Sequence, residues 1–171
     1  YYFMPMGVAA PVLVSLARVD NEGAAPQAAS IYSLFNFHLG VASNGAREPS
    51  ADGEEVSYDA ARPTFYEYGP SQGTLAYTAL RPLGKRTTST GANGVYQKLL
   101  AGADLDDSST TAGPTSDVTP GFQSPTTVIA PGGTMWFATA ITWALDEDAA
   151  PDVDLVRAWA NDRSPEQLLD A

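Results

Sequence analysis

The sequence predicts an all-β protein: an antiparallel β-sandwich with a short helix near its C-terminal end. Two observations support this fold class. About eight segments have the alternating apolar pattern, or the β-branched and aromatic enrichment, of strands, and turn residues separate them. The chain also lacks a repeat period and the alternation of strand and helix patterns typical of a parallel sheet. We expect an eight-stranded single jelly roll, with an immunoglobulin-like strand order as the alternative.

The length of 171 residues is enough for one β-rich domain with its own core. We expect an apolar N-terminal arm at residues 1–10, a single sandwich domain at 11–160 and a helical tail at 161–171. No cysteine is present, which excludes disulfides and thiol catalysis. The apolar N-terminal stretch has no basic region and is interrupted by Pro5 and Pro11, so it does not read as a signal peptide.

The charge balance is strongly acidic. There are 20 acidic and 9 basic residues, a net charge of −11, and only Lys85 and Lys98 are lysines. In molar salt the Debye length falls to about 3 Å, so neighbouring carboxylates stop repelling one another. The composition therefore favours a protein of a high-salt environment, and an ordinary acidic domain charged for solubility is the alternative. It disfavours nucleic-acid binding, which needs clustered basic residues.

Five strands are predicted in the first half of the chain, each rich in β-branched or aromatic residues and followed by a turn or loop signal. They are Pro11–Asp20, Ser30–Ser43, Glu55–Ala61, Pro63–Gly69 and Gly73–Leu83. In the second of them Ile31, Ser33 and Phe35 share one side.

The second half begins with polar segments. Residues 84–94 are predicted as a loop, residues 95–105 as either a strand or a short helix, and residues 106–125 as a long exposed loop. Residues 126–145 then predict two strands joined at Pro131-Gly132-Gly133.

The last of these strands is apolar on both sides. Met135, Phe137 and Ile141 alternate with Trp136, Ala138 and Ala140. We therefore expect this strand to be covered on two sides, by the opposing sheet and by a neighbouring or additional segment.

The acidic residues after this strand are expected to form a solvated exit loop. They are Asp146, Glu147, Asp148, Asp152 and Asp154. Residues 153–162 fit either a strand or a helical turn. A short helix follows, with Ser164 as the N-cap, Pro165 at its first position and Gln167 completing a capping box.

No residue pattern predicts catalysis or a cofactor. His38 is the only histidine, and with no partner histidine or nucleophile motif it is interpreted as structural. A hydrolytic or cupin-like enzyme would need carboxylates gathered around His38, and it is the least supported hypothesis. Asp104, Asp106 and Asp107 are weak calcium candidates, because the stretch lacks the third ligand and the glycine of an EF-hand loop. A solvated acidic loop is the favoured interpretation of these three residues.

The first six residues, YYFMPM, are apolar and aromatic. Such a segment either folds back on its own domain or docks on a neighbouring subunit. Tyr1, Tyr2, Phe3 and Trp136 are the predicted contacts between subunits, because large aromatic residues dominate interfaces.

The acidic, lysine-poor sandwich, the apolar N-terminal arm and the segment APGGTMWFATAITW at residues 130–143 resemble the capsid proteins of icosahedral, membrane-containing viruses of halophilic archaea. The resemblance implies an upright single jelly roll that packs in pseudo-hexameric capsomers over an internal membrane. The implied partners are copies of the chain and other capsid proteins, with the membrane reached through other proteins. The implied location is the virion shell, and the family has no catalytic residues to carry over.

The predicted function is therefore a structural capsid subunit, not an enzyme, that binds no nucleic acid. The alternative is an extracellular adhesion or carbohydrate-binding sandwich of a haloarchaeal surface protein. In that alternative, exposed aromatic residues would stack on sugars and the acidic loop at Asp104 would hold calcium.

Overall fold

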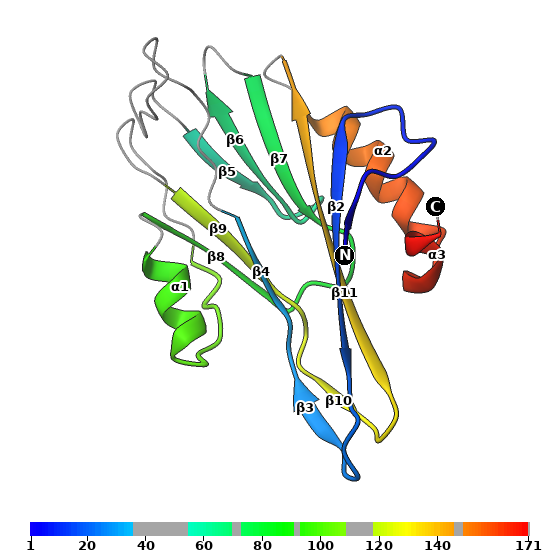
Figure 1. The fold of residues 1–171 in the computed structure, drawn as a ribbon. Coiled ribbons are helices and arrows are strands. Elements are labelled where there is room, and N and C mark those ends of the chain that lie inside the picture. Colours follow the sequence, from blue (N-terminus) through cyan, green and yellow to red (C-terminus); the bar gives the residue numbers. More distant parts are fainter. Residues whose placement is uncertain (36–54, 70–72, 91–92, 109–117, 146–148, 171) are drawn as a thin grey trace, which may run out of the picture.

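The computed structural model describes residues 1–35, 55–69, 73–90, 93–108, 118–145 and 149–170. In these residues the chain forms eleven strands and three helices (Figure 1). The strands are β1 (Tyr2–Phe3), β2 (Val12–Asp20), β3 (Gln27–Ala29), β4 (Tyr32–Leu34), β5 (Glu55–Asp59), β6 (Thr64–Gly69), β7 (Gly73–Ala79), β8 (Lys85–Thr90), β9 (Val118–Gln123), β10 (Thr127–Ile129) and β11 (Thr134–Ala144). The helices are α1 (Asn93–Leu100), α2 (Ala150–Asn161) and α3 (Pro165–Leu169).

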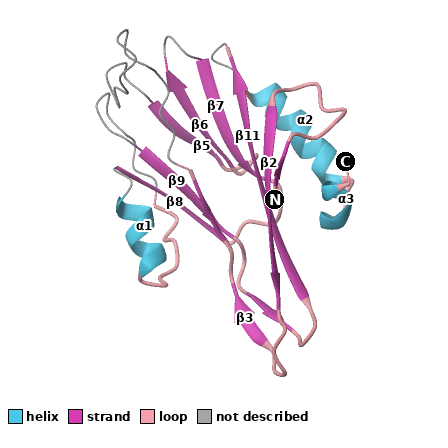
Figure 2. Cartoon of the chain, viewed as in Figure 1, coloured by secondary structure: helices cyan, strands magenta, loops and turns pink. Residues whose placement is uncertain are grey.

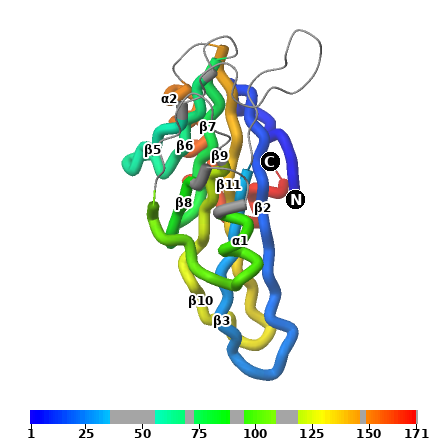
Figure 3. The backbone as a smooth tube through the Cα atoms, turned by 90° about the vertical axis from the view of Figure 1, so that its left-hand side faces the viewer, coloured from blue at the N-terminus to red at the C-terminus, as the bar shows by residue number. Residues whose placement is uncertain are grey.

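The strands form three antiparallel sheets. The largest has the order β1-β2-β11-β7-β6-β5, the second the order β4-β9-β8, and β3 pairs with β10 in a two-stranded ribbon. The ribbon lies at one end of the molecule, a position that Figure 3 shows from the side. The predicted all-β, antiparallel sandwich is confirmed, whereas this strand order does not confirm a jelly roll.

The two larger sheets pack face to face around an aromatic core. The Phe122 ring of β9 lies 5.1 Å from the Phe65 ring of β6 and 4.6 Å from the Tyr77 ring of β7, centroid to centroid. Phe65, Tyr77 and Phe122 are at most 1% exposed. This contact joins strands from both sheets, so it holds the sandwich together.

Strand β11 is buried on both faces, as predicted. Met135 and Phe137 belong to the core between the sheets, whereas Ala138 and Ala140 belong to a second core cluster on the other face. That second cluster also contains Val156 of α2 and Leu168 of α3. The additional segment that the apolar pattern called for is therefore the C-terminal helical region (Figure 2).

Helix α2 corrects the prediction for the acidic exit loop. Asp152 and Asp154 lie in this helix, and helical structure begins at Ala150 and not at residue 161. Val153 and Val156 are fully buried, and the Asp154 side chain is 56% exposed. The helix forms because its apolar residues recur at helical spacing, so one face can pack on the sheet and the acids can face solvent.

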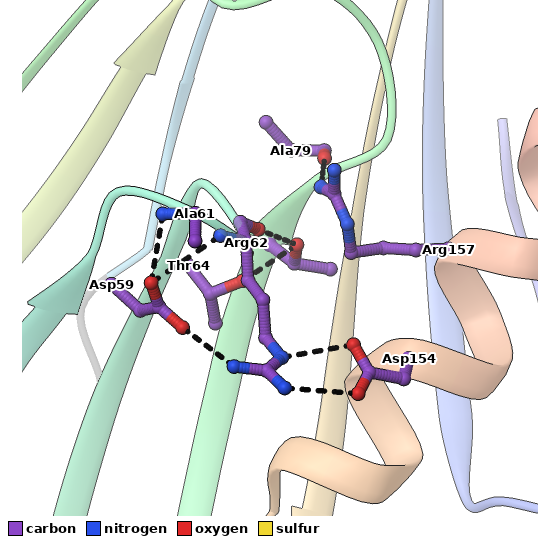
Figure 4. Close-up of polar contacts among 8 residues, drawn as sticks. Asp59, Ala61, Arg62, Thr64, Ala79, Asp154 and Arg157 are labelled. Carbon is purple, nitrogen blue, oxygen red and sulfur yellow. Dashed lines mark hydrogen bonds and ion pairs between the residues drawn. The ribbon is translucent and has the colours of Figure 1, made fainter.

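A salt bridge fastens α2 to the turn between β5 and β6. Arg62 donates from Nε to Asp154 Oδ1 (2.9 Å) and from Nη2 to Asp154 Oδ2 (3.1 Å), and its Nη1 also donates to Asp59 Oδ2 (3.0 Å; Figure 4). These contacts hold the pKa of both carboxyl groups below its usual value, chiefly through the hydrogen bonds from Arg62. The bidentate geometry sets the position of the helix as well as contributing energy.

Two segments predicted as loops are strands. Residues 85–90 form β8, and residues 118–123 form β9, the central strand of the second sheet. The predictions were wrong because threonine-rich sequence fits both loops and strands, and because Ser, Gly and Pro residues made residues 106–125 resemble a loop. Gly121 instead makes room for α1, since a Cβ atom there would lie 2.8 Å from Val95 Cγ1.

Residues 95–105 were predicted to form either a strand or a short helix. The structure shows a helix, because residues 93–100 form α1 on the outer face of the second sheet. Of the strand predicted at Ser30–Ser43, Tyr32–Leu34 is observed as β4. His38 lies outside the described residues.

Candidate assembly surface

The N-terminal segment adds a strand to its own sheet. Tyr2 pairs with Ser15 and Phe3 with Val14 of β2, and Leu16 N donates to Tyr1 O at 2.9 Å. The predicted arm therefore folds back on its own domain, and β1 becomes an edge strand of the six-stranded sheet.

The side chains of this segment remain largely exposed. The exposed fractions are 60% for Tyr1, 72% for Tyr2, 77% for Met4 and 81% for Met6. We call these four residues the N-terminal apolar surface. Of these four residues only Tyr2 lies in β1, and Tyr1, Met4 and Met6 lie shortly before or after it. The paired strand therefore anchors a short segment of exposed apolar side chains, which is typical of a protein–protein contact.

The four predicted interface residues fall into two groups. Tyr1 and Tyr2 are exposed, whereas Phe3 and Trp136 are partly buried against the core cluster beneath α2 and α3. The Trp136 ring lies 6.4 Å from the Tyr1 ring and 5.3 Å from the guanidinium carbon of Arg18. Trp136 thus supports the N-terminal apolar surface from within the same chain.

A cleft of about 280 Å³ opens between the sheets beside this edge. Its lining includes Tyr2, Ser33 and Thr139. The Tyr77 hydroxyl donates to Ser33 Oγ at 2.5 Å, and Ser33 Oγ lies 3.2 Å from Thr139 Oγ1. Burial raises the pKa of Tyr77, so its phenol stays protonated as a donor. This arrangement joins the two sheets through neutral hydroxyl groups.

The hydroxyl groups of Ser33, Tyr77 and Thr139 were not among the predicted site residues, although the sequence contains a signal for two of them. Ser33 interrupts the apolar side formed by Ile31 and Phe35, and Thr139 interrupts the one formed by Phe137 and Ile141. A polar residue within an apolar alternation predicts a buried hydrogen bond. Periodicity alone could not show that these two interruptions meet.

The three calcium candidates are bound to other protein groups. Asp104 pairs with Lys85 at 3.1 Å and accepts from Gln123 at 2.7 Å. Asp106 pairs with Lys98, and Asp107 accepts from a backbone nitrogen. Within the described parts of the chain, no three Asp, Glu, His or Cys residues are grouped so that they could hold a metal ion. The three aspartates thus act in this structure as hydrogen-bond acceptors that hold the segment after α1 against the neighbouring strands.

We predict that Asp106 makes the protein sensitive to acid. The hydrogen bond from Lys98, followed by those from Ser108 and Thr87, holds the Asp106 pKa far below its usual value. A carboxyl with a lowered folded-state pKa contributes stability above its unfolded pKa of about 3.9, and loses it as the pH falls further. Asp106→Asn should therefore lower the melting temperature at neutral pH. It should also make the decrease in melting temperature between pH 7 and pH 3 smaller than in the wild type.

The matched control is Asp162→Asn, an exposed aspartate whose side chain has no hydrogen bond or ion pair in the described structure. Asp162→Asn should leave unchanged both the melting temperature at neutral pH and its decrease between pH 7 and pH 3. Equal effects of the two variants on thermal unfolding would contradict the role assigned to Asp106.

Comparison with known protein families and with curated proteins finds no match for this chain. None of the helices in the described residues combines the length and the apolar character needed to cross a membrane.

Proposed function

We propose that the chain is a structural subunit that assembles with copies of itself, as a capsid subunit of a virion in a high-salt environment. The observation that carries the proposal is the N-terminal apolar surface. Tyr1, Tyr2, Met4 and Met6 are all at least 60% exposed, although backbone hydrogen bonds hold residues 1–3 of this segment on β2. An ordered, exposed apolar edge is favourable when another chain covers it.

The charge of the chain supports the salt dependence of this assembly. A net charge of −11 per copy opposes close approach in dilute buffer, and molar salt screens that repulsion to about 3 Å. Salting-out ions also strengthen apolar burial. Copies should therefore associate in molar salt and separate at low ionic strength, and the partners would be further copies and other shell proteins.

The test is a triple variant, Tyr2→Ser, Met4→Ser and Met6→Ser. We expect its self-association constant in molar KCl, measured by sedimentation equilibrium, to fall at least about tenfold, because truncating central apolar contacts costs about 1 kcal/mol or more each. The matched control is Leu100→Ser with Val128→Ser, whose side chains are 64% and 68% exposed elsewhere. Both variants should keep the wild-type circular dichroism spectrum.

Two results would overturn the proposal. One is a wild-type protein that stays monomeric in molar KCl at every concentration. The other is an equal loss of association in the control variant, which would show that association is non-specific and driven by any exposed apolar side chain. Electron microscopy of the associated wild-type protein should show a regular lattice, and amorphous aggregates would argue against a shell subunit.

The adhesion or carbohydrate-binding alternative finds less support in this geometry. Its calcium site would need Asp104 and Asp106 free, and both are engaged by Lys85 and Lys98. The two functions differ in one measurement, because a calcium-dependent rise in melting temperature that a chelator reverses would favour the alternative.

A further inference from the structure

A second cavity of about 280 Å³ lies where the end of β7 and the following linker meet α2. Its polar lining residues are Arg81 of the linker and Arg157 and Asn161 of α2. Its apolar lining includes Leu80, Pro82 and Leu83. The cavity therefore combines two cationic groups with a hydrocarbon wall.

Backbone carbonyl groups hold both arginine side chains in place. Arg157 Nη1 donates to Ala79 O at 2.7 Å, a bond visible in Figure 4. Arg81 donates from Nη1 to Ala160 O at 3.1 Å and from Nη2 to Arg163 O at 2.8 Å. The guanidinium groups are thus positioned before any ligand binds, which lowers the entropy cost of binding.

These two arginines differ from the other basic residues of the described structure. Arg18, Arg62, Lys85 and Lys98 form salt bridges with aspartates. Arg86 and Arg163 lie over the rings of Tyr58 and Trp159. Arg81 and Arg157 have neither kind of partner among the residues that the structure describes, although acids outnumber bases 20 to 9 in the chain.

Two positive charges that share a cavity repel each other. Asp154 attracts Arg157 and Glu166 attracts Arg81, but neither carboxylate forms a salt bridge with them in the described structure. Burial lowers the pKa of Arg81, so its guanidinium is already partly removed from water, and attraction to Glu166 offsets this only in part. An anion between the two arginines would relieve both costs.

The unused donors suit a carboxylate. A guanidinium has five N–H donors in a planar fork, and Arg157 uses one of them among the described residues, Nη1. The Nε and Nη2 side of the fork therefore matches a carboxylate. The cavity lies just below the roughly 300–1,000 Å³ typical of ligand pockets, which favours a small ligand. The apolar wall would cover a short hydrocarbon chain.

We propose that this cavity is a binding site for a carboxylate carried on a short apolar body, with Arg157 as its bidentate partner and Arg81 as a second cationic contact. The source of such a group is either a free small organic acid or an acidic side chain of another copy. The site is separate from the N-terminal apolar surface, so the two proposals can fail independently.

The test is titration calorimetry of dilute, monomeric protein with isovalerate, at constant ionic strength with chloride as the balancing ion. We expect saturable binding that Arg157→Gln weakens at least about tenfold, because a charge-assisted, bidentate contact is lost. Arg157→Lys should also weaken binding, since lysine keeps the charge but not the fork. Arg18→Gln is the control and should bind as the wild type does.

Equal binding of isovalerate by the Arg157→Gln and wild-type proteins would overturn the proposal, as would equal binding of the uncharged isoamyl alcohol. No detectable isovalerate binding by the folded wild-type protein would also overturn it. The source of the carboxylate follows from a second measurement. If isovalerate lowers self-association in molar salt, the natural ligand is an acidic side chain of another copy, and if association is unchanged, it is a free acid.

Discussion

Replacing Phe122 by alanine is expected to lower the free energy of unfolding by about 3–5 kcal/mol, the range observed when a buried phenylalanine is truncated. Phe122 is 0% exposed, and its ring contacts Phe65 and Tyr77 of the opposing sheet. Alanine would leave a cavity between two sheets whose backbones are held by their own ladders. The site therefore cannot collapse easily, which places the cost towards the upper part of the range.

Urea denaturation followed by tryptophan fluorescence measures this change. Phe122→Leu should cost about 1.5 kcal/mol or less, because most of the volume is retained. Tyr96→Ala, at an aromatic residue of α1 that is 49% exposed, should stay within about 0.5 kcal/mol of the wild type. A similar loss for Phe122→Ala and Tyr96→Ala would show that the two sheets are not held by this contact.

Asn21→Ala should cost about 3 kcal/mol, because it removes three side-chain hydrogen bonds, each contributing about 1 kcal/mol net. Asn21 is 6% exposed and follows β2. Its Nδ2 donates to Ala25 O at 2.9 Å and to Ile129 O at 2.8 Å, and its Oδ1 accepts from Gly23 N at 3.0 Å. The side chain therefore joins the turn after β2 to the end of β10.

The backbone of Asn21 strengthens this junction. Asn21 N donates to Gly133 O at 3.0 Å, and Gly132 N donates to Asn21 O at 2.8 Å. Gly132 has φ +72°, a conformation that favours glycine. The segment at residues 131–133 is thus a turn between two sheets, because β10 pairs with β3 while β11 pairs with β2. The two strands predicted to be joined here therefore belong to different sheets.

The same denaturation assay tests Asn21→Ala, and Asn161→Ala provides an exposed asparagine as the control. We expect the control to remain within about 0.5 kcal/mol of the wild type. If Asn21→Ala unfolds at the wild-type urea concentration, the hydrogen bonds to the β3–β10 ribbon contribute nothing to the fold.

The N-terminal apolar surface shows how far a sequence pattern reaches towards function. The composition of YYFMPM predicts an apolar contact of some kind, whether with its own domain or with a neighbour. The structure shows that the backbone pairs with β2 while Tyr2, Met4 and Met6 stay exposed. The backbone pairing and the exposure of these side chains both depend on where β2 lies, and no local sequence pattern predicts that position.

The cavity between Arg81 and Arg157 could not be predicted from the sequence at all. The two residues lie in different elements and match no motif. They become neighbours because α2 packs on the six-stranded sheet beside the end of β7. Among the described residues they form neither a salt bridge nor a contact with an aromatic ring. This property can be recognised only when all the ion pairs of the described structure are known.

Three features could be predicted from the order of residues alone: the all-β class, the strands at Val12–Asp20 and Thr134–Ala144, and the burial of the second of these strands on both faces. These follow from the alternation of neighbouring side chains, which is a local property. Contacts between distant segments were needed to establish the sheet order, the strands at Lys85–Thr90 and Val118–Gln123, and the helix at Ala150–Asn161. Threonine-rich and acidic segments have weak local preferences, so their conformation depends on which distant surface they cover and which distant strand accepts their hydrogen bonds.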